Sequence, residues 1–325
     1  MPIDPITVQR AAQALRQNVG RVIVGQERAI ELVFVALLVE GHVLLEDVPG
    51  IGKTTLAKAM ARSLGCAFQR IQFTPDLLPG DITGVGIYNP KSEQFDYRPG
   101  PVVTNVLLAD EINRATPRAQ SALLESMEER QVTVDGVTRP LPRPFIVLAT
   151  QNPIELEGTF PLPEAQIDRF LMRLRLGYPT PEDERTILRR FRPGSPLLGL
   201  EPVVSAAELL TLGEICREVM VHELLETYLI SLANASRGQA GLALGLSPRA
   251  TLALYHAAQA LAAIRGRAYV RPDDIQHLAE PVLAHRLIPN APARMHGAAP
   301  GELVAQLLKS VPVPVEESWS LDGAA

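Results

Sequence analysis

The segment LLEDVPGIGKTT, from Leu44 to Thr55, constrains the fold more than any other part of the sequence. An apolar run, HVLLED, precedes a glycine-containing turn, and TLAKAMARSLG follows with the apolar spacing of a helix that ends at Gly65. A strand, such a turn and a helix in this order direct backbone N–H groups and the positive end of a helix dipole to one point. The segment therefore predicts a phosphate-binding loop.

The turn departs from the usual pattern G-x-x-x-x-G-K-[ST] at its first position, where Asp47 stands in place of glycine. Position 47 lies at the end of the strand, before the turn that would wrap the phosphates, so we expect the loop to bind them and Asp47 to cap the turn. Lys53 would reach the β- and γ-phosphates, and the Thr54 hydroxyl would ligate Mg²⁺. The residues predicted to bind the nucleotide here are Pro49, Gly50, Ile51, Gly52, Lys53, Thr54 and Thr55.

Strands and helices alternate along the first part of the chain. Apolar runs such as NVLLAD and FIVLAT predict buried strands, and PRAQSALLESMEER predicts a helix between them. This alternation indicates an α/β domain over residues 1–180, with a parallel sheet covered on both faces. Two stretches interrupt it, and their alternating residues and turn signals predict hairpin-like insertions at about 81–100 and 130–141.

Strand signals disappear after GYPTPEDE, and amphipathic helical segments take their place. We predict a second, all-helical domain over residues 181–310. The last residues, 311–325, contain VPVPVEESWSLDGAA and are expected to form a flexible tail.

Composition excludes several classes of protein. The chain of 325 residues is 46% hydrophobic, enough for one large or two medium globular domains. Its 31 basic and 36 acidic residues give a net charge of −5, which disfavours nucleic acid as a partner. The two cysteines lie too far apart in the sequence to indicate a disulfide framework or a zinc site. No apolar run approaches the ~20 residues of a membrane span, so we expect a soluble, cytoplasmic protein.

Two further strand ends carry polar residues suited to phosphoryl chemistry. VLLADEINRA delivers Asp110 toward Mg²⁺ and Glu111 toward the attacking water. FIVLATQN ends in Asn152, whose amide could orient the water or sense the γ-phosphate. An Asn before Pro153 is equally typical of a turn, and the residues alone leave both interpretations open.

Taken with LGLSPRA, these motifs resemble those of the MoxR family of AAA+ ATPases, a member of the helix-2-insert clade related to the ATPase subunits of magnesium chelatase. The resemblance runs from about Val24 to Arg286 and includes Asp at the first loop position. It implies the AAA+ fold with a helical lid, and ATP with Mg²⁺ as cofactors. It also implies a hexameric ring whose two insertions face the pore.

The resemblance also assigns residues that the motifs alone do not. It marks Asn152 as sensor 1, Arg169 as the arginine finger that acts on a neighbouring subunit, and Arg249 as sensor 2. The segment near adenine is matched by Val24, Gly25 and Gln26. An ion pair with Asp168 is the structural alternative for Arg169, and the other candidates for the subunit boundary are Arg114, Arg118 and Arg173.

In LSPRA, Ser247 is expected to cap a helix and Pro248 to occupy its first turn, which places Arg249 at a helix N-terminus.

The function that the resemblance implies is hydrolysis of ATP to remodel or mature client proteins, including insertion of a cofactor or metal. The partner that the resemblance implies is commonly a von Willebrand factor A domain protein. The alternatives are a magnesium-chelatase-like ATPase subunit, a nucleotide-gated scaffold with little hydrolysis, and a DNA motor, which the net charge disfavours. The sequence does not identify the client.

Overall fold

The computed structural model describes residues 4–153, 158–297 and 299–314. The chain forms two compact units, one of residues 10–214 and the other of residues 1–9 and 215–325. The division falls after Glu214 and not near residue 181. Compactness does not by itself decide where a domain begins, so the predicted boundary stays a prediction. Of the predicted tail, residues 315–325 lie outside the described residues.

A five-stranded parallel sheet with the strand order β2-β5-β8-β1-β9 forms the centre of the unit of residues 10–214. Its strands are β1 (Val43–Glu46), β2 (Phe68–Gln72), β5 (Val106–Asp110), β8 (Ile146–Gln151) and β9 (Met172–Leu174). Successive residues of a strand face opposite sides of the sheet. Because Leu107 and Leu108 are both fully buried, both faces are covered, as the near-continuous apolar runs predict.

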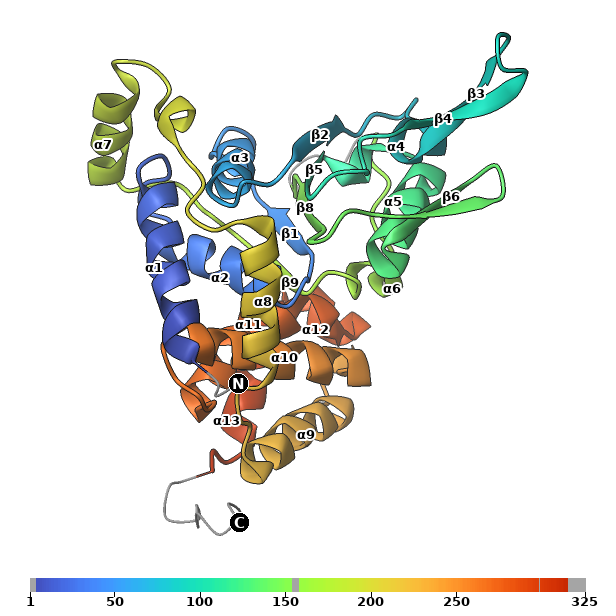
Figure 1. Ribbon diagram of the computed structural model, residues 1–325. Helices are drawn as coiled ribbons and strands as arrows, with labels where there is room; N and C mark the ends of the chain where they lie inside the picture. The colour runs from blue at the N-terminus through green and yellow to red at the C-terminus, as the bar shows by residue number, and fades with distance from the viewer. Residues whose placement is uncertain (1–3, 154–157, 298, 315–325) are drawn as a thin grey trace. The chain divides into compact units, whose positions relative to one another are not determined.

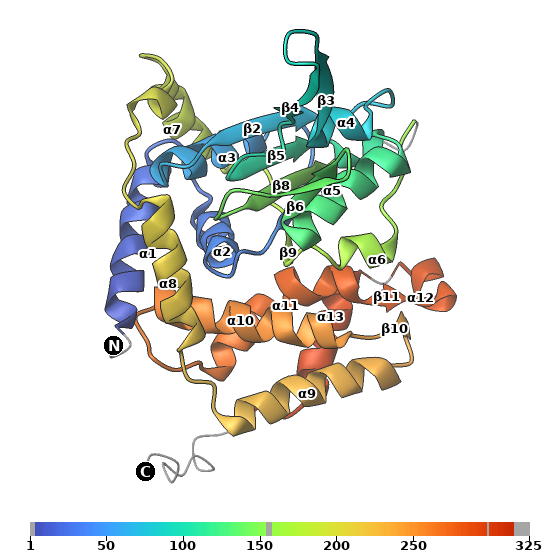
Figure 2. The same cartoon turned by 45° about the vertical axis from the view of Figure 1, so that its right-hand side comes forward.

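Helices on the two faces provide this cover. Figures 1 and 2 show α2 (Glu27–Leu38) and α3 (Lys53–Ser63) on one side of the sheet and α5 (Pro117–Glu129) on the other. On the α5 side, Leu107 and Val147 from the sheet join Leu123 and Met127 from the helix in one hydrophobic core. The alternation of strands and helices in the sequence is confirmed.

Two antiparallel hairpins are inserted around α5. The first joins β3 (Gly84–Asn89) and β4 (Gln94–Pro99), and the second joins β6 (Gln131–Val134) and β7 (Val137–Pro140) through a turn at Asp135 and Gly136. Both hairpins were predicted from the sequence. The guanidinium of Arg139 stacks 4.2 Å from the ring of Tyr97, so the second hairpin contacts the first.

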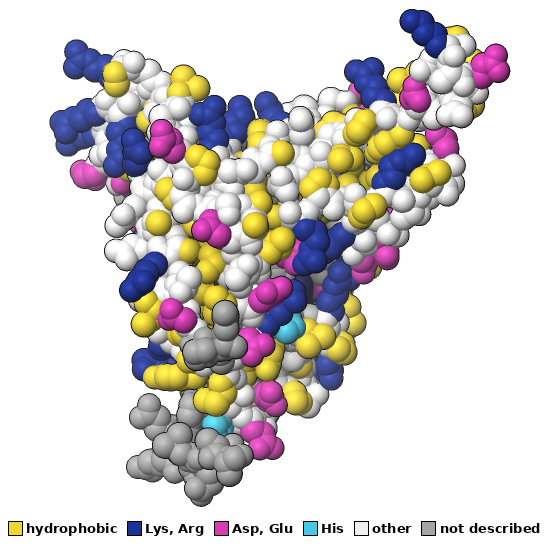
Figure 3. Space-filling view, in the orientation of Figure 1, with side chains coloured by type: hydrophobic (Ala, Val, Ile, Leu, Met, Phe, Trp, Pro, Cys, Tyr) yellow, Lys and Arg dark blue, Asp and Glu magenta, His cyan; other side chains and the backbone are white. Residues whose placement is uncertain are grey.

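The first hairpin carries hydrophobic side chains at its surface, and Figure 3 shows some of them at the upper right. Ile87, Tyr88 and Phe95 are all exposed, Phe95 to 71%.

The remaining helices of this unit are α1 (Pro5–Gly20), α4 (Pro79–Thr83), η1 (Ile112–Arg114), α6 (Glu164–Ile167), α7 (Pro181–Phe191), η2 (Pro196–Gly199) and α8 (Ala206–Arg217). Helix α1 begins in the other unit, and α8 ends in it.

The second unit is mainly helical. Its helices are α9 (Glu223–Gly238), α10 (Pro248–Ile264), α11 (Pro272–Leu283), η3 (Ala284–Arg286), α12 (Ala291–Met295) and α13 (Pro300–Ser310). A short antiparallel pair, β10 (Leu242–Leu244) with β11 (Ile288–Pro289), adds to the helices that the sequence predicts. Strands of two or three residues are too short to show an alternating pattern. No helix in the described part of the chain is both long and apolar enough to cross a membrane.

Candidate nucleotide-binding site

Three neighbouring strands bring polar residues to one edge of the sheet. Strands β1, β5 and β8 are parallel, and their carboxyl ends carry Glu46, Asp110 and Gln151. Strand β1 lies between β8 and β9, so the chain runs to opposite sides of it. In open α/β sheets, ligands bind at the carboxyl ends of the strands where the order reverses in this way.

The loop after β1 exposes its backbone at this edge. Gly50 and Gly52 adopt positive φ angles of 86° and 95°, a region that favours glycine. A Cβ atom added to either residue would meet no atom within 4 Å, so open space adjoins the loop. Helix α3 begins directly afterwards, and its first N–H groups have no partners within the helix. Open space, glycine backbone and a helix N-terminus are the features that anion-binding loops use.

Lys53, the first residue of α3, is held beneath this loop. Its ammonium donates hydrogen bonds to the carbonyl oxygens of Asp47 at 2.6 Å and Val48 at 3.2 Å, and the residue is only 8% exposed. Burial lowers the pKa of Lys53, and the carboxylates of Asp47, Asp110 and Glu111 act to raise it. A buried cation therefore lies within electrostatic reach of the two acidic residues at the end of β5.

Asp47 has a role that explains why the loop does not need glycine at this position. Its carboxylate accepts hydrogen bonds from the backbone N–H groups of Leu176 and Gly177, which follow β9. Asp47 thus joins the start of the loop to the segment after β9, outside the turn formed by Gly50 and Gly52. The prediction that Asp47 caps the turn of the loop was wrong, because the N–H groups that its carboxylate accepts from belong to a distant segment.

Replacing Asp47 with glycine is expected to reduce stability more than nucleotide affinity. Loss of the carboxylate leaves two backbone donors unpaired, which costs about 1–3 kcal/mol in the free energy of unfolding. The affinity for ATP should fall by less than about tenfold, or ~1.4 kcal/mol, because the carboxylate lies outside the loop that faces the phosphates. Urea unfolding and titration with fluorescent ATP measure the two effects, and a larger loss of affinity would place Asp47 within the phosphate site.

The acidic pair at the end of β5 is held by residues of both neighbouring strands. On β8, Thr150 donates a hydrogen bond of 2.6 Å from its hydroxyl to Asp110 Oδ1 and accepts one of 2.8 Å from the backbone N–H of Glu111. On β2, Arg70 binds Asp110 Oδ2 at 2.7 Å and Gln72 donates to Glu111 Oε2 at 2.7 Å. Glu111 has a φ of 56°, a strained conformation of the kind that clusters at functional sites.

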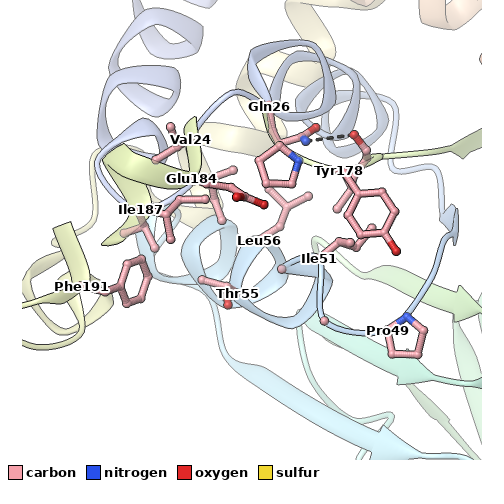
Figure 4. Close-up of a pocket in the computed structure, with 16 residues that line it drawn as sticks. Val24, Gln26, Pro49, Ile51, Thr55, Leu56, Tyr178, Glu184, Ile187 and Phe191 are labelled. Atoms are coloured by element: carbon pink, nitrogen blue, oxygen red, sulfur yellow. Dashed lines mark hydrogen bonds between the residues drawn. The ribbon is translucent and has the colours of Figure 1, made fainter. Parts of the chain in front are cut away.

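A pocket of about 440 Å³ extends from the loop. Figure 4 shows Pro49, Ile51 and Thr55 at the loop, and Val24, Ile187 and Phe191 at the other end. A volume of this size and a mainly apolar lining are typical of small-molecule sites. Of the residues predicted to bind the cofactor, the pocket lining includes Val24, Gln26, Pro49, Gly50, Ile51, Gly52 and Thr55, but not Gly25, Lys53 or Thr54.

Comparisons with known proteins agree with this geometry. Residues 42–172 match the family described as "ATPase family associated with various cellular activities (AAA)", and residues 234–307 match an AAA lid domain. Chaperone MoxR1 of Mycobacterium tuberculosis is 47% identical, over 91% of this chain and 81% of that protein. The chain belongs to the MoxR family of AAA+ ATPases.

Two further comparisons cover nearly the whole chain. Protein YeaC of Bacillus subtilis is 48% identical over 93% of this chain and 94% of its own length. The crystal structure of a proposed ATPase from Cytophaga hutchinsonii is 39% identical, with a TM-score of 0.90, and the match covers 96% of this chain and 97% of that one. The predicted fold class and ATPase activity are confirmed.

Membership of an AAA+ ATPase family implies nucleotide binding, and the residues present fit a nucleotide. The loop offers open space, backbone donors and a buried lysine. For Mg²⁺, the described residues hold no group of three or more His, Cys, Asp or Glu side chains arranged around a metal. Mg²⁺ sites of nucleotide enzymes usually take one or two protein ligands, and the phosphates and water supply the others.

The candidate arginines of this MoxR-family chain occupy different surroundings. Arg169 pairs with Glu128 on α5 at 2.9 Å, Arg114 with Glu111 at 3.1 Å, and Arg173 with Glu46 at 3.5 Å. Arg118 is exposed near the start of α5 and makes no side-chain hydrogen bond or ion pair to the described residues.

The two predicted sensor residues lie in different units. Asn152 directly follows β8 and is 7% exposed, whereas Arg249 belongs to the mainly helical unit of residues 1–9 and 215–325. There, Ser247 caps α10 by accepting from Ala250 N, and Pro248 is the first helical residue, as predicted. Arg249 is thus the second residue of α10.

Three residues of the acidic cluster escaped the sequence analysis: Arg70, Gln72 and Thr150. Arg70 and Gln72 are two residues apart in β2, so they lie on the same face of that strand. Their position next to the acidic pair depends on which strands are neighbours in the sheet. That order could not be read from periodicity, although the three polar residues of the five in β2 (FQRIQ) are a signal that could have been noted.

Proposed function

We propose that this ATPase binds ATP with its phosphates against the loop of residues 49–55. Lys53 carries this proposal, because a buried ammonium beneath an exposed glycine turn is suited to meet the β- and γ-phosphates. The adenine lies in the pocket bounded by Val24, Gln26 and α7. Gly25 adjoins this region with a φ of 71°, and a side chain there would collide with Asp183 of α7.

Residues around the end of β5 supply the chemistry of hydrolysis. Thr54 and Asp110 would hold Mg²⁺, which would neutralise charge on the phosphates. Glu111 accepts a proton from the water that attacks the γ-phosphorus, while the bond from that phosphorus to the β–γ bridging oxygen breaks. Asn152 orients the water. Arg70 binds the Asp110 carboxylate in this structure, so it would share that carboxylate with a bound Mg²⁺ or move away from it.

We further propose that the chain assembles into a ring of six subunits, the number that the resemblance to the MoxR family implies. Each nucleotide site is then completed by a neighbouring subunit. Arg169 is the residue that acts across the boundary, and Arg249 senses the γ-phosphate from the lid. The AAA and AAA lid matches and the similarity to MoxR proteins support an oligomer.

Client remodelling is the proposed use of the hydrolysis energy. The Mycobacterium tuberculosis relative is named a chaperone. A von Willebrand factor A domain protein is the partner that the family resemblance suggests. Stimulation of the ATPase by candidate client proteins but not by DNA is the expected result. Stimulation by DNA alone would favour a DNA motor, and hydrolysis that no protein changes would contradict client remodelling. The cytoplasmic location stays a prediction.

Lys53→Ala tests the nucleotide site. Removing a charge that meets two phosphates should weaken ATP binding by about 100-fold, since charge-assisted hydrogen bonds contribute about 1.5–3 kcal/mol each. Titration with fluorescent ATP measures the loss of affinity. Lys58→Ala is the matched control, because Lys58 lies on the same helix but does not line the pocket. Unchanged affinity in Lys53→Ala would contradict the loop assignment.

A further inference from the structure

The pocket beyond the loop contains one charged side chain. Glu184 carries the one carboxylate among the lining residues. The walls around it are formed by apolar side chains, those of Val22, Val24, Leu56, Ile187 and Phe191. Figure 4 shows the Glu184 carboxylate pointing into the space between Val24, Leu56 and Ile187. The Glu184 side chain makes no hydrogen bond or ion pair to any of the described residues. Its acceptor capacity is therefore available to a ligand.

Helix α7 holds Glu184 in this position. Thr180 caps the helix and Asp183 completes a capping box, with hydrogen bonds between the Thr180 hydroxyl and Asp183 in both directions. The N-terminal turn of α7 packs directly against Gly25, where a Cβ would collide with the Asp183 carboxylate. At the other end, Arg190 donates to the carbonyl oxygen of Gly20. Contacts at both ends fix the helix against the segment that precedes α2.

The distance of Glu184 from the loop along the pocket indicates which part of a bound nucleotide would lie next to it, namely the base. A triphosphate bound at Gly50, Gly52 and Lys53 places its base toward the apolar end of the pocket, because stacking surfaces lie there and phosphate donors do not. Adenine presents a 6-amino group, a hydrogen-bond donor, whereas guanine and hypoxanthine present an acceptor oxygen at the same position. A carboxylate accepts from the amine and repels the oxygen.

We infer that Glu184 selects adenine by accepting a hydrogen bond from its 6-amino group, an inference that rests on the nucleotide site proposed above. The shape of the apolar walls contributes binding that is common to all purines. Glu184 contributes the difference between them, because a site built to bond a donor rejects analogues that lack it.

Equilibrium binding of four nucleotides to the full chain tests this inference: ATP, purine riboside triphosphate (which lacks the 6-substituent), ITP and GTP. The wild type should bind ATP about tenfold or more tightly than the purine and inosine compounds, as expected for a hydrogen bond to a charged acceptor. In Glu184→Gln the preference for ATP over ITP should fall or reverse, since an amide can also donate to the 6-oxygen. Glu184→Ala should bind ATP, ITP and purine riboside triphosphate about equally.

The matched control is Glu182→Gln, an exposed glutamate in the first turn of α7 that does not line the pocket. It should keep the wild-type order of affinities. Glu184 is exposed in the free protein, so its replacement leaves the core intact, and thermal unfolding checks this. An unaltered ratio of ATP to ITP affinity in Glu184→Gln would overturn the inference while leaving the nucleotide site in place. Failure of the wild type to bind any of the triphosphates would instead overturn the proposed site itself.

Discussion

Glu111→Gln is expected to lower kcat for ATP hydrolysis by roughly 10²- to 10⁴-fold, the usual effect of losing a general base. The amide keeps the size of the side chain but cannot accept a proton from water. Binding of ATP and Mg²⁺ should remain, because Lys53 and Asp110 are unchanged. Single-turnover hydrolysis and equilibrium binding of ATP measure the two effects separately, and the variant should accumulate in its ATP-loaded form.

Glu125→Gln is the control for this substitution, since Glu125 is exposed on α5 away from the pocket lining. It should hydrolyse ATP at the wild-type rate. If Glu111→Gln also turns over like the wild type, water is activated by another group. The strained backbone of Glu111 would then need a different explanation, such as the turn into η1.

Arg169→Ala should reduce kcat by about 10³-fold or more with ATP affinity nearly unchanged. The reason is that an arginine supplied by a neighbouring subunit meets charge that develops on the γ-phosphate only during transfer. Its ion pair with Glu128 offers a control within the same chain. If Arg169 only anchors α5, Glu128→Gln should impair hydrolysis as much as Arg169→Ala does. If Arg169 acts across the boundary, Glu128→Gln should retain activity.

Mixing two inactive variants separates an action in trans from an action on the same subunit. Arg169→Ala and Lys53→Ala, each inactive alone, should recover some activity when assembled together. At certain boundaries an intact Arg169 then faces an intact loop. Co-assembly is verified by sedimentation before the ATPase assay. Continued inactivity in verified mixtures would contradict the role in trans, and full activity of Arg169→Ala alone would direct attention to Arg118, which is exposed near the start of α5.

The sequence predicted the elements better than the contacts between them. Strands β1, β5 and β8 are short apolar runs, and the loop lies between a strand and a helix, so local patterns were sufficient to identify them. The contacts of Asp47 with Leu176 and of Gln72 with Glu111 join segments far apart in the sequence. Such contacts depend on which strands become neighbours, and no spacing in the sequence encodes that. Glu184 was missed because the sequence of α7 resembles that of an ordinary amphipathic helix and does not show what the helix packs against.

Helix α5 connects the acidic cluster with the inserted hairpins. It begins six residues after Glu111, spans roughly 20 Å at 1.5 Å per residue, and leads through Arg130 directly into β6. The stacking of Arg139 on Tyr97 then connects this second hairpin to the first. Helix α5 and this stacking therefore form a continuous path of contacts from the acidic cluster to both hairpins. The first hairpin, at the end of this path, carries the exposed aromatic residues Tyr88 and Phe95.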